Sequence, residues 1–295
     1  MSRIHSTATT GQWMMHVPFS LLPAAVLMGV LYSPHIWRLL ACCVVTALIS
    51  EALMMYWRKR SIKAAWSDGS ALVTGVLLGF CLPWSVPSWL AIIATVSAIW
   101  LGKQLYGGLG HNPFNPAMVG YLVVLVSFPE TMSQWLVDGV SQATPLTAHQ
   151  VATQGNIPLN SDFGAWWAIS LAYLLGGLWL VYRGIADGIL ALATLLGIGI
   201  TSCLVWWLAD FSLSPWWQIT AWSSLFGAFY ITTDPVTAST TYWGRWIYGL
   251  GIGVMTVLIR QWGSHADGLA FAVLLMNSLV PWLDHFTARW SRQHV

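Results

Sequence analysis

Residues 187–208 read DGILALATLLGIGITSCLVWWL, and no charged residue follows the opening aspartate. A run of this length and character is typical of a helix that crosses a lipid bilayer, which needs roughly 20 apolar residues. Hydrocarbon offers backbone groups no hydrogen-bond partner, so we interpret all ten apolar runs of the chain as helices. Their approximate ranges are 18–32, 39–57, 69–83, 87–102, 117–129, 163–181, 187–208, 217–231, 246–259 and 268–284.

The composition excludes a soluble domain. Of 295 residues, 57% are hydrophobic and only 7% are charged, whereas a soluble domain carries about 25% charged residues. The net charge of +2 gives no reason to expect nucleic acid as a partner. The four cysteines have no Cys-x-x-Cys spacing and the eight histidines no i, i+4 pair, so no metal site is predicted. The sequence predicts an all-α polytopic membrane protein whose surroundings are the lipid bilayer.

A weak internal repeat divides the chain. Asp68-Gly69 and Asp187-Gly188 each open an apolar run and lie 119 positions apart. Pro113 and Pro235 lie 122 positions apart in two Pro-interrupted segments, although a further Asp-Gly, at Asp267, fits neither half. Short spans with internal Gly and Pro indicate re-entrant segments, and paired segments of this kind point to a central site at the repeat interface. We therefore expect two membrane halves of about five helices each, residues 1–130 and 163–295, joined by a polar loop, residues 131–162.

Lysine and arginine predict how the chain is oriented in the membrane. The 131–162 loop has neither residue, so we expect it to face outward and both termini to be cytoplasmic. Arg38 and Arg260 fall on the side opposite to the other cations in this arrangement. The concordant cations are Arg58, Lys59, Arg60, Lys63, Lys103, Arg183, Arg245, Arg289 and Arg292.

Two polar segments interrupt the apolar pattern and supply candidate ligands. Residues 107–116, GGLGHNPFNP, cannot remain a regular helix because they contain three glycines and two prolines. Asn112 and Asn115 could satisfy the freed backbone groups or contact a cofactor ring; a re-entrant turn that only closes the fold is the alternative. In residues 232–241, TTDPVTASTT, Thr233 and Asp234 suit either a helix cap or a ligand or ion.

Carboxylates near the membrane spans are candidates for an ion pathway, since a charge in hydrocarbon is costly unless it is paired or hydrated. Glu51 lies inside its predicted span, and a hydrogen-bonded structural carboxyl is the alternative for it. The candidate ion-pathway residues are Glu51, Asp68, Asp187 and Asp234.

Three segments resemble a known family, and together they cover nearly the whole chain. The family contains the D subunit of the Rnf ion-translocating electron-transport complex and, more distantly, the B subunit of sodium-pumping NADH:quinone reductase. The short chain, without a long N-terminal extension, favours the Rnf type. The matching segments are residues 107–121 (GGLGHNPFNPAMVGY), 226–241 (from FGAF through TDPVTASTT) and 267–277 (DGLAFAVLLMN).

The resemblance implies ten helices in two five-helix repeats and an FMN esterified through its phosphate to a threonine in a Ser-Gly-Ala-Thr motif. That motif corresponds to Ser141-Gln142-Ala143-Thr144, so Thr144 is the expected attachment residue. Gln142 replaces the usual glycine, which removes close backbone approach and conformational freedom. Asp138, Ser141 and Ala143 still match what a flavin transferase is expected to read. A second, non-covalent flavin, of the riboflavin type, is implied between the helices.

The resemblance also implies partners and a location. Subunits of the Rnf A, B, C, E and G types would deliver electrons from NADH or ferredoxin, and a flavin transferase would attach the FMN. Electron transfer would be coupled to Na⁺ or H⁺ translocation across a bacterial inner membrane, with residues 131–162 in the periplasm. This chain would then be a redox subunit and not a stand-alone enzyme. From the residues alone, a small-solute channel or transporter with a five-plus-five repeat remains the alternative.

Overall fold

The computed structural model describes residues 10–137, 140–142, 163–208, 214–263 and 268–293. Three predicted flavin-motif residues, Asp138, Ala143 and Thr144, lie outside these ranges. The described part is almost entirely helical, and each of the ten predicted apolar runs coincides with one helix or with a short series of helices. The first-half helices are α1 (Thr10–Leu31), α2 (His35–Trp57), α3 (Ile62–Ser67), α4 (Ser70–Cys81), α5 (Ser88–Ser97), the π-helix η1 (Ala98–Lys103), the 3₁₀ turn η2 (Gln104–Tyr106), α6 (Pro116–Ser127) and α7 (Pro129–Met132).

The second half is built in the same way. Its helices are α9 (Phe163–Tyr182), α10 (Gly188–Leu208), α11 (Pro215–Thr220), α12 (Trp222–Phe226), the π-helix η3 (Gly227–Ile231), α13 (Tyr242–Trp262) and α14 (Leu269–Gln293). Among the described residues, six helical stretches are long and apolar enough to cross a membrane, and α4 and α6 are shorter apolar helices. The protein is therefore an all-α polytopic membrane protein, as the sequence predicts.

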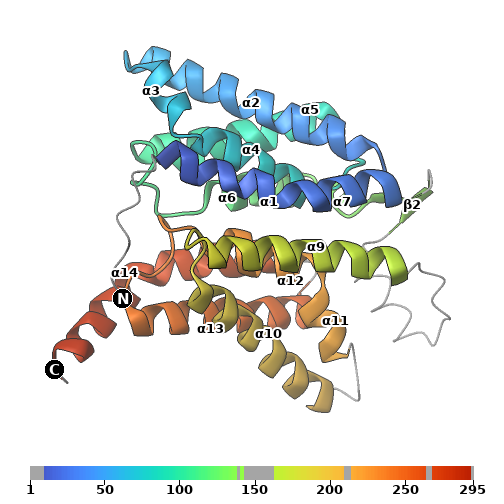
Figure 1. The fold of residues 1–295 in the computed structure, drawn as a ribbon, viewed down its shortest axis with the longest axis vertical. Coiled ribbons are helices and arrows are strands. Elements are labelled where there is room, and N and C mark those ends of the chain that lie inside the picture. The colour runs from blue at the N-terminus through green and yellow to red at the C-terminus, as the bar shows by residue number, and fades with distance from the viewer. Residues whose placement is uncertain (1–9, 138–139, 143–162, 209–213, 264–267, 294–295) are drawn as a thin grey trace.

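The two halves form separate layers. Figure 1 shows α1 to α7 in the upper part of the view and α9 to α14 in the lower part. The start of α1, helix α3 and the end of α14 lie on the left of the bundle, and strand β2 lies on the right. The basic cluster next to α3 and the start of the polar 131–162 stretch are therefore at opposite ends of the helices.

Glycines allow the closest helix pair of the second half, α10 and α13, to approach. A Cβ atom at Gly253 would lie 2.4 Å from the Thr194 carbonyl oxygen, and one at Gly197 would lie 2.6 Å from the Leu250 carbonyl oxygen. Without a hydrophobic driving force between helices in lipid, small residues of this kind bring backbones into contact and promote packing.

The structure differs from the sequence expectation at two element boundaries. Helix α1 begins at Thr10 and continues through Pro18 and Pro23, earlier than the predicted start at 18. The polar stretch opens with a hairpin, in which β1 (Trp135–Val137) pairs antiparallel with β2 (Val140–Gln142). The hairpin pairs Leu136 with Ser141, which places the backbone of one predicted flavin-motif residue in a strand.

Two of the described cations that entered the orientation argument are buried. Lys103 is 2% exposed at the end of η1. Arg260 is 4% exposed within α13, where its guanidinium donates to the Ser223 and Ser224 hydroxyls and the Gln218 amide oxygen. Arg260 disagrees with the predicted membrane orientation because it is a buried structural residue. Lys103, which agrees with that orientation, is buried too and is not evidence for a cytoplasmic loop.

Candidate functional site

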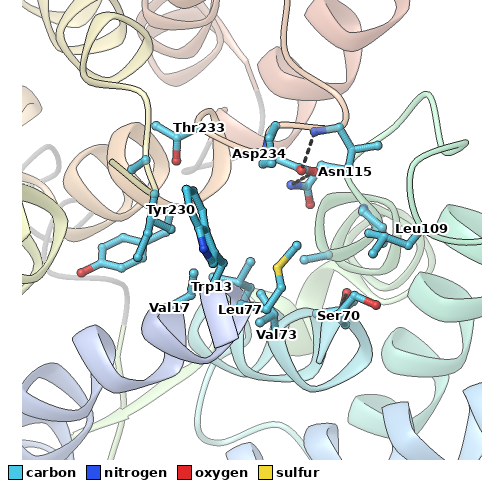
Figure 2. A pocket seen from close by; sticks show the side chains of 18 of the residues that line it. Trp13, Val17, Ser70, Val73, Leu77, Leu109, Asn115, Tyr230, Thr233 and Asp234 are labelled. Atoms are coloured by element: carbon cyan, nitrogen blue, oxygen red, sulfur yellow. Dashed lines mark hydrogen bonds between the residues drawn. The ribbon is translucent and has the colours of Figure 1, made fainter. Parts of the chain in front are cut away.

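A cavity of about 430 Å³ lies where the two halves meet. Figure 2 shows Trp13, Val17 and Leu77 on one wall and Tyr230, Thr233 and Asp234 on the other. The first-half wall comes from α1, α4 and the segment from Lys103 to Ala117, and the second-half wall from the end of α9 and residues 229–236. This volume lies in the range of roughly 300–1,000 Å³ that small-molecule and cofactor sites occupy.

A π-helix precedes the polar segment in each half. Helix η1 ends at Lys103, just before the Gly-rich segment, and η3 ends at Ile231, just before the Thr-Asp-Pro segment. One extra residue per turn widens the helix and shifts the direction of the following chain, and π-helical turns are frequent at functional sites. In this fold both turns deliver a polar segment to the cavity.

Asn115 and Asp234 join the halves across the cavity edge. Asn115 Nδ2 donates to Asp234 Oδ2 at 3.3 Å, and Figure 2 shows the two side chains facing each other. Each residue also organises its own segment, since Asn115 Oδ1 accepts from the Met118 N–H and Asp234 Oδ1 from the Val236 N–H. The sequence alternatives of cap and ligand are therefore both compatible with the observed positions.

These contacts refine the internal repeat. Asn115-Pro116 and Asp234-Pro235 occupy matching positions and lie 119 residues apart, the same offset as Asp68 and Asp187. The structure thus favours this register over the 122-residue offset between Pro113 and Pro235. In both copies the side-chain oxygen accepts from a backbone N–H shortly after the proline, three residues on from Asn115 and two residues on from Asp234.

Asn277 of α14 connects the two sides of this junction. Its Oδ1 accepts from the Asn115 N–H at 3.1 Å, and its Nδ2 donates to the Thr237 carbonyl at 3.1 Å. The same Nδ2 lies 2.7 Å from the Tyr248 hydroxyl of α13. One buried amide therefore contacts both halves, and a buried polar network that is satisfied in this way gives a rigid wall.

Asn112 lines the cavity and has one side-chain oxygen without a partner among the described residues. Its Nδ2 donates to the Phe114 carbonyl at 3.0 Å, and the residue is 4% exposed. Its Oδ1 has no hydrogen-bond partner among the described residues. An unsatisfied buried acceptor costs about 1–3 kcal/mol, so a ligand with an N–H or O–H donor would be stabilised there.

The other predicted ligand of the second half, Thr233, is turned back toward its own helix. Its hydroxyl donates to the Phe229 carbonyl at 2.7 Å, although Thr233 lines the cavity. All four candidate cofactor contacts outside the flavin-attachment motif, Asn112, Asn115, Thr233 and Asp234, therefore line one cavity.

A buried ion pair stands behind the first-half wall. Lys103 Nζ lies 2.5 Å from Glu51 Oε1, and the two side chains are 2% and 1% exposed. The same Nζ donates to the Ser70 hydroxyl at 2.5 Å, and that hydroxyl donates to Asp68 Oδ1. Gln104 Nε2 also donates to Glu51 Oε1, at 3.1 Å. Glu51 contacts Lys103 directly, and Asp68 is connected to it through Ser70. Asp234, a third predicted pathway residue, lies on the opposite wall.

Asp187 is placed elsewhere. Its Oδ1 caps α10 by accepting from the Ile189 N–H at 2.8 Å, and its Oδ2 pairs with Arg245 at 2.9 Å. The two side chains are 28% and 29% exposed, and neither belongs to the cavity lining. The role of Asp187 in an ion pathway stays a prediction.

Sequence reasoning misses several residues of the site. Lys103 follows an apolar run, which predicts a loop position, and nothing local indicates that the chain turns inward there. Ser70 and Trp13 have no distinguishing pattern. The one local indication for Ser70 is that it follows Asp68-Gly69. This pair recurs at Asp187-Gly188, and in both places it marks the start of a helix.

The chain is similar to proteins of one family along almost its entire length. Residues 1–291 match the model of the NQR2, RnfD, RnfE family. A protein of Cronobacter sakazakii is 37% identical over 96% of this chain and 95% of its own length, and one of Alcanivorax borkumensis is 38% identical over 96% and 93%. One of Pectobacterium atrosepticum is 40% identical over 82% of this chain and 83% of its own length. All three are named as the D subunit of an ion-translocating oxidoreductase complex.

Proposed function

Because the chain belongs to the NQR2, RnfD, RnfE family, we propose that it is the D subunit of an Rnf-type ion-translocating oxidoreductase complex. It passes electrons through flavin across a bacterial inner membrane, and this transfer is coupled to movement of Na⁺ or H⁺. The observation that carries the proposal is the cavity between the halves, which brings together Asn112, Asn115, Thr233 and Asp234.

One flavin is FMN bound to Thr144 through a phosphoester. Support comes from the sequence, since Ser141, Ala143 and Thr144 match the attachment motif of the family and Asp138 stands three residues before Ser141. The hairpin β1–β2 ends at Gln142, two residues before Thr144. Strand pairing gives the chain a fixed entry into the motif without a glycine at position 142.

A second, non-covalent flavin of the riboflavin type occupies the cavity. The residues fit such a group, because Asn112 Oδ1 is a buried acceptor without a partner among the described residues and a flavin ring has an N–H donor. Tyr230, Trp13 and Phe229 supply aromatic surface around it. When bound, the flavin supplies the redox chemistry, and the protein orients it and excludes water.

The proposed orientation puts residues 131–162 in the periplasm and the termini in the cytoplasm. It is supported by the basic cluster from Arg58 to Lys63, which lies next to α3 at the end of the bundle opposite β2. Electrons that reach Thr144 must then cross the bilayer from partner subunits of the A, B, C, E and G types.

In-gel fluorescence tests the covalent flavin. Protein made together with its flavin transferase is run on a denaturing gel, where a phosphoester-linked flavin survives and fluoresces. Wild-type protein and a Ser133→Ala control should fluoresce equally, because Ser133 is exposed and lies outside the motif. Thr144→Ala should be dark.

The competing outcome is a channel or transporter without a redox role. A wild-type band that is dark in the presence of the transferase would remove the redox assignment and favour permeation through the cavity. Fluorescence that persists in Thr144→Ala would move the attachment to another residue.

A further inference from the structure

Four side chains form one hydrogen-bonded chain from the cavity to the half-exposed start of α4. Lys103 and Ser70 line the cavity, and Asp68 lies beyond them, next to the basic loop. The donors point the same way, since Lys103 Nζ donates to Ser70 Oγ and Ser70 Oγ donates to Asp68 Oδ1. Glu51 holds the lysine in place from the other side, at 2.5 Å.

We propose that Lys103, Ser70 and Asp68 are a proton-transfer route between the cavity and the basic face of the protein, with Glu51 as the partner that holds Lys103 in place. This inference rests on the proposed function, because the proton that moves along the route is released when the flavin proposed for the cavity is oxidised.

The chemistry of each group suits its position. A serine hydroxyl donates one hydrogen bond and accepts two, so Ser70 can accept from Lys103 and donate to Asp68 at the same time. Chains of ionisable residues buried in membrane proteins are the usual proton relays. The neighbouring branch from Glu51 to Gln104 and Arg58 is different, because an amide and a guanidinium hold their protons.

The transfer balances without moving electrons. One N–H bond of Lys103 breaks as its proton bonds to Ser70 Oγ, and the Ser70 O–H bond breaks as its proton bonds to Asp68 Oδ1. Lys103 is then a neutral amine and Asp68 a carboxylic acid. Asp68 gives its proton to solvent water, and Lys103 takes one from the cavity ligand, so that one proton has left the cavity.

Glu51 holds the Lys103 amine next to Ser70. Its side chain is 1% exposed, and its Oε2 has no partner among the described residues. Within the described ranges, the other charged groups that face this cluster are Arg58, through Gln104, and Asp234, across the cavity. The contact with Glu51 therefore fixes the position from which Lys103 exchanges a proton with the cavity and with Ser70.

The internal repeat supplies a matched control. Asp68 Oδ1 accepts from the Ser70 N–H at 2.8 Å, and Asp187 Oδ1 accepts from the Ile189 N–H at 2.8 Å. Substitution by asparagine keeps the capping oxygen in both places but removes an exchangeable carboxyl proton. The side chain that corresponds to Ser70 is Ile189, which has no hydroxyl, so only Asp68→Asn interrupts a relay.

The experiment follows proton release from the assembled complex in weakly buffered detergent solution with a pH-indicator dye. The complex is reduced beforehand and oxidised with a pulse of ferricyanide in a stopped-flow instrument. Ser70→Ala and Asp68→Asn should slow proton release roughly a hundredfold, the lower end of what a positioned proton-transfer group contributes. Ser70→Thr, which keeps the hydroxyl, and Asp187→Asn should release protons at the wild-type rate.

Extracted non-covalent flavin is measured on the same samples and separates the two proposals. Wild-type release rates in both Ser70→Ala and Asp68→Asn, with wild-type flavin content, would overturn the proton route. A wild-type complex without non-covalent flavin would refute the proposed cavity ligand, while slow release in the two variants would still support the route for another redox group. If the Ser70→Ala complex does not assemble, the release rate of Asp68→Asn alone tests the proton route.

Discussion

Asp68 and Asp187 begin α4 and α10 with the same hydrogen bond, yet their surroundings differ. Asp68 is joined through Ser70 to Lys103, whose pair with Glu51 is 2% and 1% exposed. Asp187 pairs directly with Arg245, at 28% and 29% exposure. The repeated Asp-Gly motif thus forms the same helix cap in both halves. Whether the aspartate is also connected to the cavity depends on its cation, which is the buried Lys103 for Asp68 and the partly exposed Arg245 for Asp187.

We expect the largest effect from removing the buried ion pair between Lys103 and Glu51. Lys103→Met leaves the Glu51 carboxylate buried without its cation, which should destabilise the folded protein by about 3–5 kcal/mol. Thermal unfolding in detergent, followed by fluorescence-detected size exclusion, measures the loss. Adding Glu51→Gln should restore much of it, because the charge that lacks a partner is then gone. Equal stability of the single and double variants would contradict the assignment of a buried ion pair.

An intermediate effect tests the part that the two sites share. Asp68→Ala and Asp187→Ala each remove the oxygen that accepts from the first turn of a helix, and loss of such a cap costs about 1 kcal/mol. The same unfolding assay should give a clear loss for both variants. A loss confined to one of them would show that the two caps are not equivalent.

We expect the smallest effect from removing the partly exposed ion pair between Arg245 and Asp187. Arg245→Gln removes an ion pair that is partly in solvent, and pairs of this kind contribute about 0–1 kcal/mol. High salt should reduce even this difference, since it screens exposed charges, while the stability lost in Lys103→Met should change little with salt. A strong salt dependence of the Lys103 variant would place its ion pair in contact with solvent.

The sequence is sufficient for the fold class and for the position of the helices. An unbroken apolar run as long as 187–208 predicts a helix, because a helix satisfies the backbone groups of the run within the run itself. The paired polar segments likewise locate the junction, and Asn112, Asn115, Thr233 and Asp234 do line one cavity.

Other features depend on contacts between distant residues and carry no local pattern. Lys103 and Glu51 are 52 positions apart, and the π-helix that ends at Lys103 turns it inward. Arg260 is 36 and 37 positions from its hydroxyl partners on α12, so its burial could not be predicted from charge counts. The sequence also leaves the repeat offset open between 119 and 122 residues, and the contact between Asn115 and Asp234 favours 119.

A density map of the intact complex at side-chain detail shows whether flavin is bound in the cavity and at Thr144. We predict density for a planar ring system in the cavity, with a polar atom within hydrogen-bonding distance of Asn112 Oδ1, and a second flavin continuous with Thr144. A cavity that continues as a water-filled pore through both halves, with no ring density and no attachment at Thr144, would contradict it.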